Sequence, residues 1–330
     1  MAKFRVAMID YDYDSLEHFE KTLAQFNARL DAQHSKDIED ATQFARDADG
    51  VIIQKLGPVD DKFMSALKKC RVLGRTGIGT DPIDVAAATK HAMFVVNVPS
   101  YCEDEVSDHA MALLLSLARR TALYDRSVRR GRWDFNAGRP VFRLRGQTLG
   151  LIGFGKIPRL IVPKAKGFGM EIISSDPYVK PEEMAKHGVR RVTLDELLEQ
   201  SDFVSVHAPL IPATRGMIGA MQFARMKKSA FIINTSRGPV IDEPALIAAL
   251  RAKQIAGAAL DVLSEEPPRP DSPLCAMENV VLTPHAGYYS EQSLVDLHVK
   301  VARNVGLVLN GRRPPEGLVN PQVLEKVKLE

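Results

Sequence analysis

The sequence predicts an α/β protein in which helices surround two separate parallel sheets. Short apolar runs alternate with segments of helical period along most of the chain, which is typical of parallel strands joined by crossover helices. The alternation occurs in two series, one before residue 100 and one from residue 148 onward. At 330 residues the chain is long for one hydrophobic core, so two domains are expected.

The first series predicts a small domain. The apolar runs expected to form its strands are residues 4–9, 50–53, 72–74 and 94–97, and the helices expected between them are 14–30, 60–69 and 82–91. Asp81 and Pro82 are typical of a helix start, with Asp as the N-cap and Pro at the first position. A long helix is expected to follow over residues 103–130.

The second series predicts a larger domain with six strands in two halves, a count typical of dinucleotide-binding domains. The expected strands are 149–152, 171–174, 203–207, 231–234, 256–260 and 280–282, and the expected helices are 156–168, 181–187, 193–200, 219–226 and 242–253. A last helix, 290–310, is expected to cross back onto the first domain. The predicted fold is therefore two Rossmann-like doubly wound parallel-sheet domains, formed by residues 1–99 with 289–330 and by residues 100–288.

Composition excludes several classes of protein. The net charge is only +3 and the basic residues are scattered, which argues against a nucleic-acid partner. Cys70, Cys102 and Cys275 lie far apart, and the chain has no CxxC or HxxxH pair, so we expect no metal site and no disulfide framework. The cysteines favour a reducing cytoplasm. We expect no signal peptide, and no window holds the roughly 18 apolar residues that a membrane span requires.

A glycine-rich turn lies between the first strand and the first helix of the second series. Gly153 and Gly155 allow a tight turn and a close approach of the backbone to a pyrophosphate, which the N-terminus of the following helix would face. Pro158 stands where a third glycine is expected, so the motif is incomplete. Asp176 ends the next strand, where a carboxylate binds ribose hydroxyls and repels a 2′-phosphate. The sequence therefore predicts NAD rather than NADP as the cofactor.

Three polar side chains follow successive apolar runs of the second series. Arg237 can bind a carboxylate through two parallel hydrogen bonds and polarise the adjacent carbonyl. His285 follows Pro284 and can exchange a proton near neutral pH, and Glu266 is the candidate partner that fixes its tautomer. Taken singly, each residue is equally compatible with a surface loop. At the ends of neighbouring strands they predict a catalytic site for a hydroxy-acid or keto-acid oxidoreductase.

These segments resemble the D-isomer-specific 2-hydroxyacid dehydrogenase family over nearly the whole chain. The family's Arg, Glu and His match Arg237, Glu266 and His285, and its ribose-binding Asp matches Asp176. The resemblance implies a flavodoxin-like substrate domain formed by both chain ends, a larger NAD-binding domain, and a cleft that separates them. It also implies a homodimer that packs through the NAD-binding domain.

The resemblance extends to further site residues. Asp261 matches a family Asp near the nicotinamide, and the backbone N–H groups of Gly77 and Ile78 would hold the substrate carboxylate. Lys55 and Arg75 are candidates for a second anionic group of the substrate, with a role as surface charges as the alternative. The full predicted cofactor set is Gly153, Gly155, Lys156, Ile157, Asp176, Pro177, His207, Ala208, Pro209, Thr214, Thr235, Ser236, Arg237, Asp261, His285 and Gly287, and the substrate set is Arg75, Gly77, Ile78, Arg237, His285 and Tyr288.

Two functional hypotheses follow. The first is an NAD-dependent D-2-hydroxyacid dehydrogenase, or 2-keto-acid reductase, that acts on a small-molecule acid with His285 as the acid/base. The second comes from the segments 176–178 and 284–293, which are similar to the branch that contains the C-terminal-binding-protein corepressors and to phosphoglycerate-dehydrogenase-like enzymes. That branch tends to carry Trp where Tyr288 stands. It suggests an NAD(H)-responsive regulator with little turnover.

Overall fold

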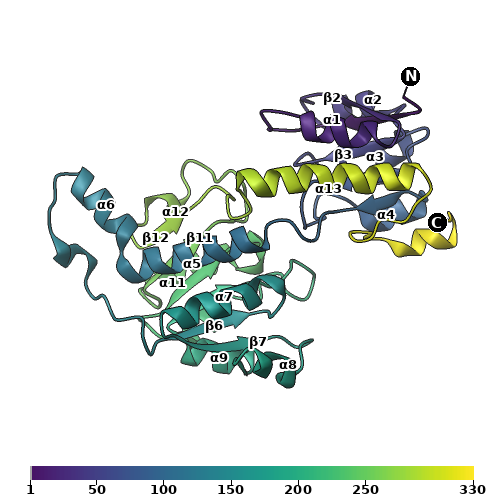
Figure 1. Cartoon of the computed structure of the whole chain (residues 1–330). Helices are drawn as coiled ribbons and strands as arrows, with labels where there is room; N and C mark the ends of the chain where they lie inside the picture. The colour runs from purple at the N-terminus through teal and green to yellow at the C-terminus, as the bar shows by residue number, and fades with distance from the viewer. Residues whose placement is uncertain (1) are drawn as a thin grey trace. The chain divides into compact units, whose positions relative to one another are not determined.

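The protein is described by a computed structural model that covers residues 2–330 (Figure 1). Its contacts divide the chain into two compact units. Unit 1 runs to Tyr101 and resumes over Ser290–Glu330, and unit 2 is Cys102–Tyr289. From the sequence, the first domain was predicted to end at residue 99 and to resume at residue 289. No helix in the described chain combines the length and the apolar character needed to cross a bilayer.

Unit 1 contains one parallel sheet of five strands in the order β2-β1-β3-β4-β5, which is a flavodoxin-like order, although only four strands were predicted and β2 was missed. Strand β1 pairs in register with both neighbours, for example Val6 with Leu30 and Val6 with Gly50. The strands are β1 (Phe4–Met8), β2 (Ala28–Ala32), β3 (Gly50–Ile53), β4 (Val72–Arg75) and β5 (Phe94–Val96), and the helices are α1 (Glu17–Ala24), α2 (Ile38–Ala45), α3 (Asp61–Ala66), α4 (Val85–Lys90), α13 (Glu291–Leu309) and the 3-10 turn η3 (Pro321–Glu325).

Helix α13 returns to unit 1 and packs against α1, β4 and β5, which confirms the predicted crossover (Figure 1). Gly74 permits the contact with β4, because a Cβ at this position would lie 2.6 Å from a methyl group of Val305. Val301 and Val305 are fully buried against the sheet. The last helix of the chain therefore completes the core of the unit that contains the N-terminus.

The predictions for unit 1 differ from the structure in detail. The helix predicted over 14–30 ends at Ala24, because the chain turns at Asn27 with φ 56° and continues as β2. Helix α2, which was not predicted, begins at the N-cap Asp37. The N-cap of α4 is Asp84 rather than Asp81, since the Asp84 carboxylate accepts a 2.9 Å hydrogen bond from Ala87 N–H.

His298 of α13 is buried among aromatic rings at the contact with α1. Its ring stacks on Phe19 at 4.3 Å and meets the edge of Tyr13 at 4.3 Å. Neither ring nitrogen has a hydrogen-bond partner in the part of the chain that the structure describes. Burial, with a contribution from His18, lowers the pKa of His298 to about 4. The imidazole is therefore held neutral at pH 7 inside an apolar contact.

This burial predicts a stability change that depends on pH. Between pH 6.5 and about 4 the unfolded chain binds a proton at His298 that the folded chain does not bind. Stability therefore falls as the pH falls, by about 1.4 kcal/mol per pH unit. We expect His298→Phe to stabilise the protein by about 2 kcal/mol more at pH 5 than at pH 7. Calorimetric unfolding at both pH values measures this difference, and an equal effect at the two pH values would contradict it.

Unit 2 contains a seven-stranded parallel sheet in the order β12-β11-β10-β9-β6-β7-β8. From β8 to β11 this is the Rossmann order, with β12 added at one edge. The strands are β6 (Thr148–Ile152), β7 (Glu171–Ser175), β8 (Arg190–Arg191), β9 (Phe203–Val206), β10 (Phe231–Asn234), β11 (Gly257–Leu260) and β12 (Val280–Leu282). The helices are α5 (Glu103–Arg119), α6 (Thr121–Arg129), α7 (Lys156–Gly167), α8 (Pro181–Lys186), α9 (Leu194–Gln200), α10 (Ala220–Arg225), α11 (Glu243–Arg251) and α12 (Pro273–Ala276), with 3-10 turns η1 (Phe135–Gly138) and η2 (Gly238–Val240).

Two predictions for unit 2 needed correction. Six strands were predicted and seven are present, because the short edge strand β8 consists of two exposed arginines and has no apolar run. The single helix predicted over 103–130 is two helices, because Arg120 adopts a left-handed conformation with φ 57° and separates α5 from α6.

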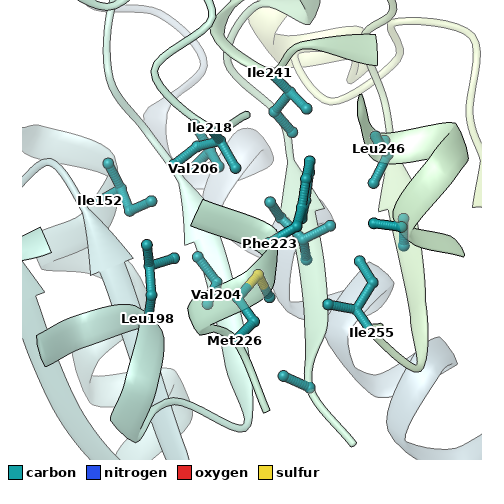
Figure 2. Close-up of a cluster of buried hydrophobic side chains, with 14 of the residues drawn as sticks. Ile152, Leu198, Val204, Val206, Ile218, Phe223, Met226, Ile241, Leu246 and Ile255 are labelled. Atoms are coloured by element: carbon teal, nitrogen blue, oxygen red, sulfur yellow. The ribbon is translucent and has the colours of Figure 1, made fainter. Parts of the chain in front are cut away.

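Apolar side chains cover both faces of this sheet. On one face, Phe223 lies at the centre of a cluster, with Val204 and Val206 on one side and Leu246 and Ile255 on the other (Figure 2). The other face is covered by α5 and α7, which pack against each other (Figure 1). Because both faces are buried, polar chemistry is confined to the loops at the strand ends.

Candidate active site

The order of the unit 2 sheet reverses direction between β6 and β9, and such reversals open a crevice at the carboxyl ends of the strands. Gly153 follows β6 there with φ +93°, and a Cβ would lie 3.0 Å from the carbonyl oxygen of His207 at the end of β9. Only glycine satisfies both the positive φ and this close approach without strain. The ends of β6 and β9 therefore lie close together at the predicted cofactor turn.

The first turn of α7 provides an open anion-binding surface. Gly155 is the N-cap, and no atom lies within 4 Å of the position that its Cβ would occupy. Lys156 and Ile157 are the first two helical residues, where backbone N–H groups have no intrahelical acceptor. Pro158 is buried in the same first turn, where its missing N–H removes no helical hydrogen bond. The turn therefore keeps the space and the donors that a pyrophosphate requires.

Asp176 lies directly after β7 and is fixed by the backbone around it. Its carboxylate accepts hydrogen bonds of 2.8 Å from Phe154 N–H and from Tyr178 N–H. The first bond ties the carboxylate to the glycine turn, and the second orders the loop that contains the exposed Pro177. This placement fits a group that accepts hydrogen bonds from ribose hydroxyls.

The loop after β9 contains four residues of the predicted cofactor set. His207 Nε2 lies 2.8 Å from Ser205 Oγ, and burial lowers the pKa of His207 to about 3 even though part of the residue reaches solvent. Ala208 is buried. Thr214 Oγ1 donates to the carbonyl of Pro209 at 2.5 Å and accepts from Ile211 N–H at 2.9 Å, which closes the loop.

The loop after β10 presents Arg237 and a buried hydroxyl. Asn234 Oδ1 accepts from Ser236 N–H at 3.0 Å and from Ser236 Oγ at 2.9 Å, and Asn234 Nδ2 donates to the Arg237 carbonyl at 3.0 Å. The Arg237 guanidinium donates to the Ser236 carbonyl at 2.7 Å. Thr235 Oγ1 is buried and has no hydrogen-bond partner in residues 2–330. A buried hydroxyl without a partner indicates a place where a bound molecule completes the site.

A glycine lets the loops after β10 and β11 touch. A Cβ at Gly238 would overlap the carbonyl of Leu263, so any larger residue would push the two loops apart. The Leu263 loop also contains Glu266, and the charge of Arg237 is one of the influences that lower the pKa of the Glu266 carboxyl. The close contact at Gly238 therefore brings the predicted cation and the predicted carboxylate into one site.

Glu266 and His285 form a direct pair. Glu266 Oε2 lies 2.6 Å from His285 Nδ1, and Glu266 Oε1 accepts from Leu263 N–H at 3.0 Å. Burial alone would raise the pKa of Glu266, but the hydrogen bond and charge of His285, the Leu263 N–H and Arg237 lower it below its ordinary value. The carboxylate is therefore ionised at neutral pH and can only accept hydrogen bonds.

This pair fixes which ring nitrogen of His285 carries the proton. Because the Glu266 carboxylate accepts, His285 Nδ1 must be the donor, and Nε2 is the nitrogen that can take up or release a proton. The side chain of His285 is 43% exposed, and Nε2 has no hydrogen bond within the described chain. The Tyr288 ring stands edge-on to the imidazole, with centroids 6.2 Å apart.

Asp261 holds the loop that carries His285. Its carboxylate accepts from Ala286 N–H and Gly287 N–H, both at 2.9 Å, and its carbonyl accepts from His285 N–H at 2.8 Å. Burial raises the pKa of Asp261, but hydrogen bonds from His109, Thr283 and the two backbone N–H groups outweigh burial and lower it. His109 and Thr283 were not predicted as site residues. The sequence feature that could have identified His109 is its position on the same helix face as the buried Val106 and Leu113.

Three predicted substrate residues lie in unit 1. Arg75 Nη1 donates to the carbonyl of Thr76 at 2.5 Å. Gly77 has φ +144°, and its N–H donates to the Arg75 carbonyl at 3.0 Å, while the Ile78 carbonyl accepts from Asn97. The Gly77 N–H predicted to hold a carboxylate is thus engaged in a local turn. The substrate roles of these residues stay predictions.

The chain is similar in sequence to known dehydrogenases and reductases. Residues 111–287 match the family model of the D-isomer-specific 2-hydroxyacid dehydrogenase, NAD binding domain. A glyoxylate reductase of Korarchaeum cryptofilum is 40% identical over 94% of this chain and 92% of its own length. A D-3-phosphoglycerate dehydrogenase of Methanocaldococcus jannaschii is also 40% identical, over 88% of this chain, but this chain spans only 55% of that relative's length.

A solved structure is also similar to this chain. A D-lactate dehydrogenase of Lactobacillus jensenii, crystallised with NAD+, matches with a TM-score of 0.76 and 28% identity, over 95% of this chain and 99% of that one. The open N-terminus of α7, the buried Thr235 hydroxyl and Asp176 all fit NAD, which the family binds. No group of three or more His, Cys, Asp or Glu side chains in residues 2–330 is arranged to hold a metal ion.

Proposed function

Because the chain belongs to the D-isomer-specific 2-hydroxyacid dehydrogenase family, we propose that it interconverts a D-2-hydroxy acid and the corresponding 2-keto acid, with Arg237, Glu266 and His285 as its catalytic residues. Family membership makes it an NAD-dependent oxidoreductase. The residue roles rest on one observation, which is the 2.6 Å pair between Glu266 and His285 beside the loop that carries Arg237. The regulatory hypothesis survives only as an outcome of the experiment below.

Each residue has a distinct role in the proposed reaction. NAD supplies a carrier of hydride at the nicotinamide ring. Arg237 binds the substrate carboxylate through paired charged hydrogen bonds and polarises the neighbouring carbonyl. His285 Nε2 gives a proton to the carbonyl oxygen during reduction and takes it from the hydroxyl during oxidation. Glu266 keeps the second proton on Nδ1 and stabilises the imidazolium that forms in the oxidative direction.

The remaining predicted residues support these roles. We propose that Lys156, Ile157 and Gly155 contact the pyrophosphate, that Asp176 and Pro177 border the ribose, and that Thr235 binds the cofactor through its buried hydroxyl. Tyr288 stands edge-on to His285, and we propose that its ring limits the size of the substrate side chain. The cytoplasmic location that the cysteines favour stays a prediction.

A panel of 2-keto acids tests the proposal. Purified protein is mixed with NADH and each acid in turn (glyoxylate, pyruvate, hydroxypyruvate, and phosphorylated or sulfonated analogues), and NADH loss is followed by absorbance. We expect rapid oxidation with at least one acid. NADH that binds tightly but is not consumed with any member would support the regulatory hypothesis and would contradict the enzymatic one.

We also propose that the protein is a homodimer that packs through unit 2. Large apolar side chains are concentrated after α5, where Trp133 is 90% exposed and Val128, Phe135 and Phe142 are also exposed. In unit 2, α6 and the chain after it extend away from the sheet (Figure 1). Exposed apolar clusters of this kind are typical of protein interfaces.

The dimer leads to a direct prediction. Sedimentation should give twice the chain mass of 36.4 kDa, and Trp133→Ala should weaken the dimer by tenfold or more, because large aromatic anchors contribute about 2 kcal/mol or more to binding. Tyr178→Ala is the matched control, since this ring is 86% exposed but lies beside Asp176 rather than in the apolar cluster. A monomeric wild type, or equal effects of the two variants, would contradict this interface.

A further inference from the structure

We propose that His109, on helix α5, is a positioning residue that holds the His285 loop in its working conformation through Thr283 and Asp261. This inference rests on the proposed function of His285. In the described chain His109 forms hydrogen bonds or ion pairs with Thr283 and Asp261 and with none of the three proposed catalytic side chains, so its effect is transmitted through hydrogen bonds.

His285 adopts a conformation that needs support. Its φ is 53°, in the left-handed region that residues other than glycine seldom occupy. A residue in this region is strained, and the strain persists only where neighbouring groups hold the backbone in place. Here the support is the set of bonds from His285, Ala286 and Gly287 N–H to Asp261. The backbone of this loop therefore depends on Asp261, whose carbonyl binds His285 N–H and whose carboxylate binds Ala286 and Gly287 N–H, while Glu266 holds the imidazole itself.

The Asp261 carboxylate is itself fixed from the other side. It is almost fully buried, and its Oδ1 accepts a 2.6 Å hydrogen bond from Thr283 Oγ1. His109 Nε2 lies 2.9 Å from Thr283 Oγ1 and 3.3 Å from Asp261 Oδ1. A Cβ at Gly287 would lie 2.9 Å from Asp261 Oδ2 and 3.5 Å from the His109 ring, so these groups pack without space for an additional atom.

The hydrogen bonds of Thr283 determine that His109 carries a proton on Nε2. The Thr283 hydroxyl has one hydrogen, and the ionised Asp261 carboxylate, which has none, receives it. The bond between Thr283 Oγ1 and His109 therefore requires His109 Nε2 to be the donor. His109 thus supplies the N–H that orients the Thr283 hydroxyl toward Asp261. Without it, the Thr283 hydroxyl loses its donor, and the buried Asp261 carboxylate loses the N–H that lies 3.3 Å from its Oδ1.

Two variants separate this hydrogen-bonding role from simple packing. His109→Leu keeps an apolar side chain of similar size but removes the donor, whereas His109→Gln keeps an N–H at a similar reach. Asp108→Asn is the matched control, because Asp108 is the adjacent residue but its side chain is exposed and pairs with Lys164. All three variants are first checked for a wild-type melting temperature within a few degrees.

The first readout is hydrogen exchange of the amides of residues 285–287, which does not depend on turnover. We expect about tenfold or faster exchange in His109→Leu, since a lost charge-assisted bond weakens the loop by about 1.4 kcal/mol or more. We expect wild-type exchange in His109→Gln and Asp108→Asn. Unchanged exchange in His109→Leu, or equal acceleration in the Leu and Gln variants, would overturn the proposal.

The second readout is kinetic. In His109→Leu we expect kcat to fall about tenfold or more while the Kd for NADH changes less than about threefold, with recovery of kcat in His109→Gln. Equal loss of kcat in both His109 variants would assign His109 to packing and would overturn the proposal. If the wild type reduces no 2-keto acid, the proposed function fails, and the exchange measurement still decides whether His109 positions the loop.

Discussion

Replacement of His285 by Ala should lower kcat for 2-keto-acid reduction by about 10²–10⁴, because the substrate oxygen then loses its proton donor. His285→Asn is the more stringent variant. Asn tolerates the left-handed φ of 53° that His285 adopts, so it removes the imidazole without penalising the backbone.

The measurement is steady-state turnover together with NADH binding. We expect both His285 variants to fold and to bind NADH, because the imidazole is partly exposed and the Asp261 contacts to this loop come from the backbone. Turnover close to wild type in His285→Asn would remove His285 from its assigned role. Loss of NADH binding in step with kcat would instead indicate a structural role.

Replacement of Arg237 by Lys should lower kcat/KM about 100-fold. Lys keeps the positive charge but cannot form the two parallel bonds that a planar guanidinium makes with a carboxylate. Hydrogen bonds to charged groups contribute about 1.5–3 kcal/mol each. The loss of one such bond in the transition state should therefore lower kcat/KM by close to two orders of magnitude. Arg251→Lys, in the last turn of α11, is the control, because Arg251 is exposed and remote from the β10 loop.

The pattern of loss identifies what Arg237 does. A rise in KM with unchanged kcat would mean that it only binds the carboxylate, and a joint fall in kcat and kcat/KM would mean that it also polarises the carbonyl in the transition state. We expect both changes. An Arg237→Lys enzyme as active as the Arg251→Lys control would contradict the assignment.

Much of the architecture could be predicted because buried parallel strands leave a direct signature. Strands such as β9, β10 and β11 are fully buried, and their apolar runs marked them to within a residue or two. The edge strands β2 and β8 lack this signature. Strand β2 has one buried residue and β8 consists of two exposed arginines, so neither was predicted. The break at Arg120 was also missed, because no Gly or Pro marks it.

The sequence could place the proposed catalytic residues together because each follows a strand of the same sheet, and the ends of parallel strands converge. Sequence spacing could not predict the groups that position them. The contact of Gly238 with Leu263 and the bond from His109 to Thr283 join segments that are distant in the chain. Such contacts depend on the packing of α5 and the loops against the sheet, and no local pattern encodes them.

Transfer of deuterium from NADH that carries deuterium at both C4 positions of the nicotinamide ring tests the central claim most directly. The reaction is run with the best 2-keto acid of the panel, and the product is examined by mass spectrometry and chiral chromatography. We predict one deuterium at C2 of a D-2-hydroxy acid, and loss of this product in His285→Asn. Unlabelled product, label in the solvent, or full transfer in His285→Asn would contradict hydride transfer assisted by a proton from His285.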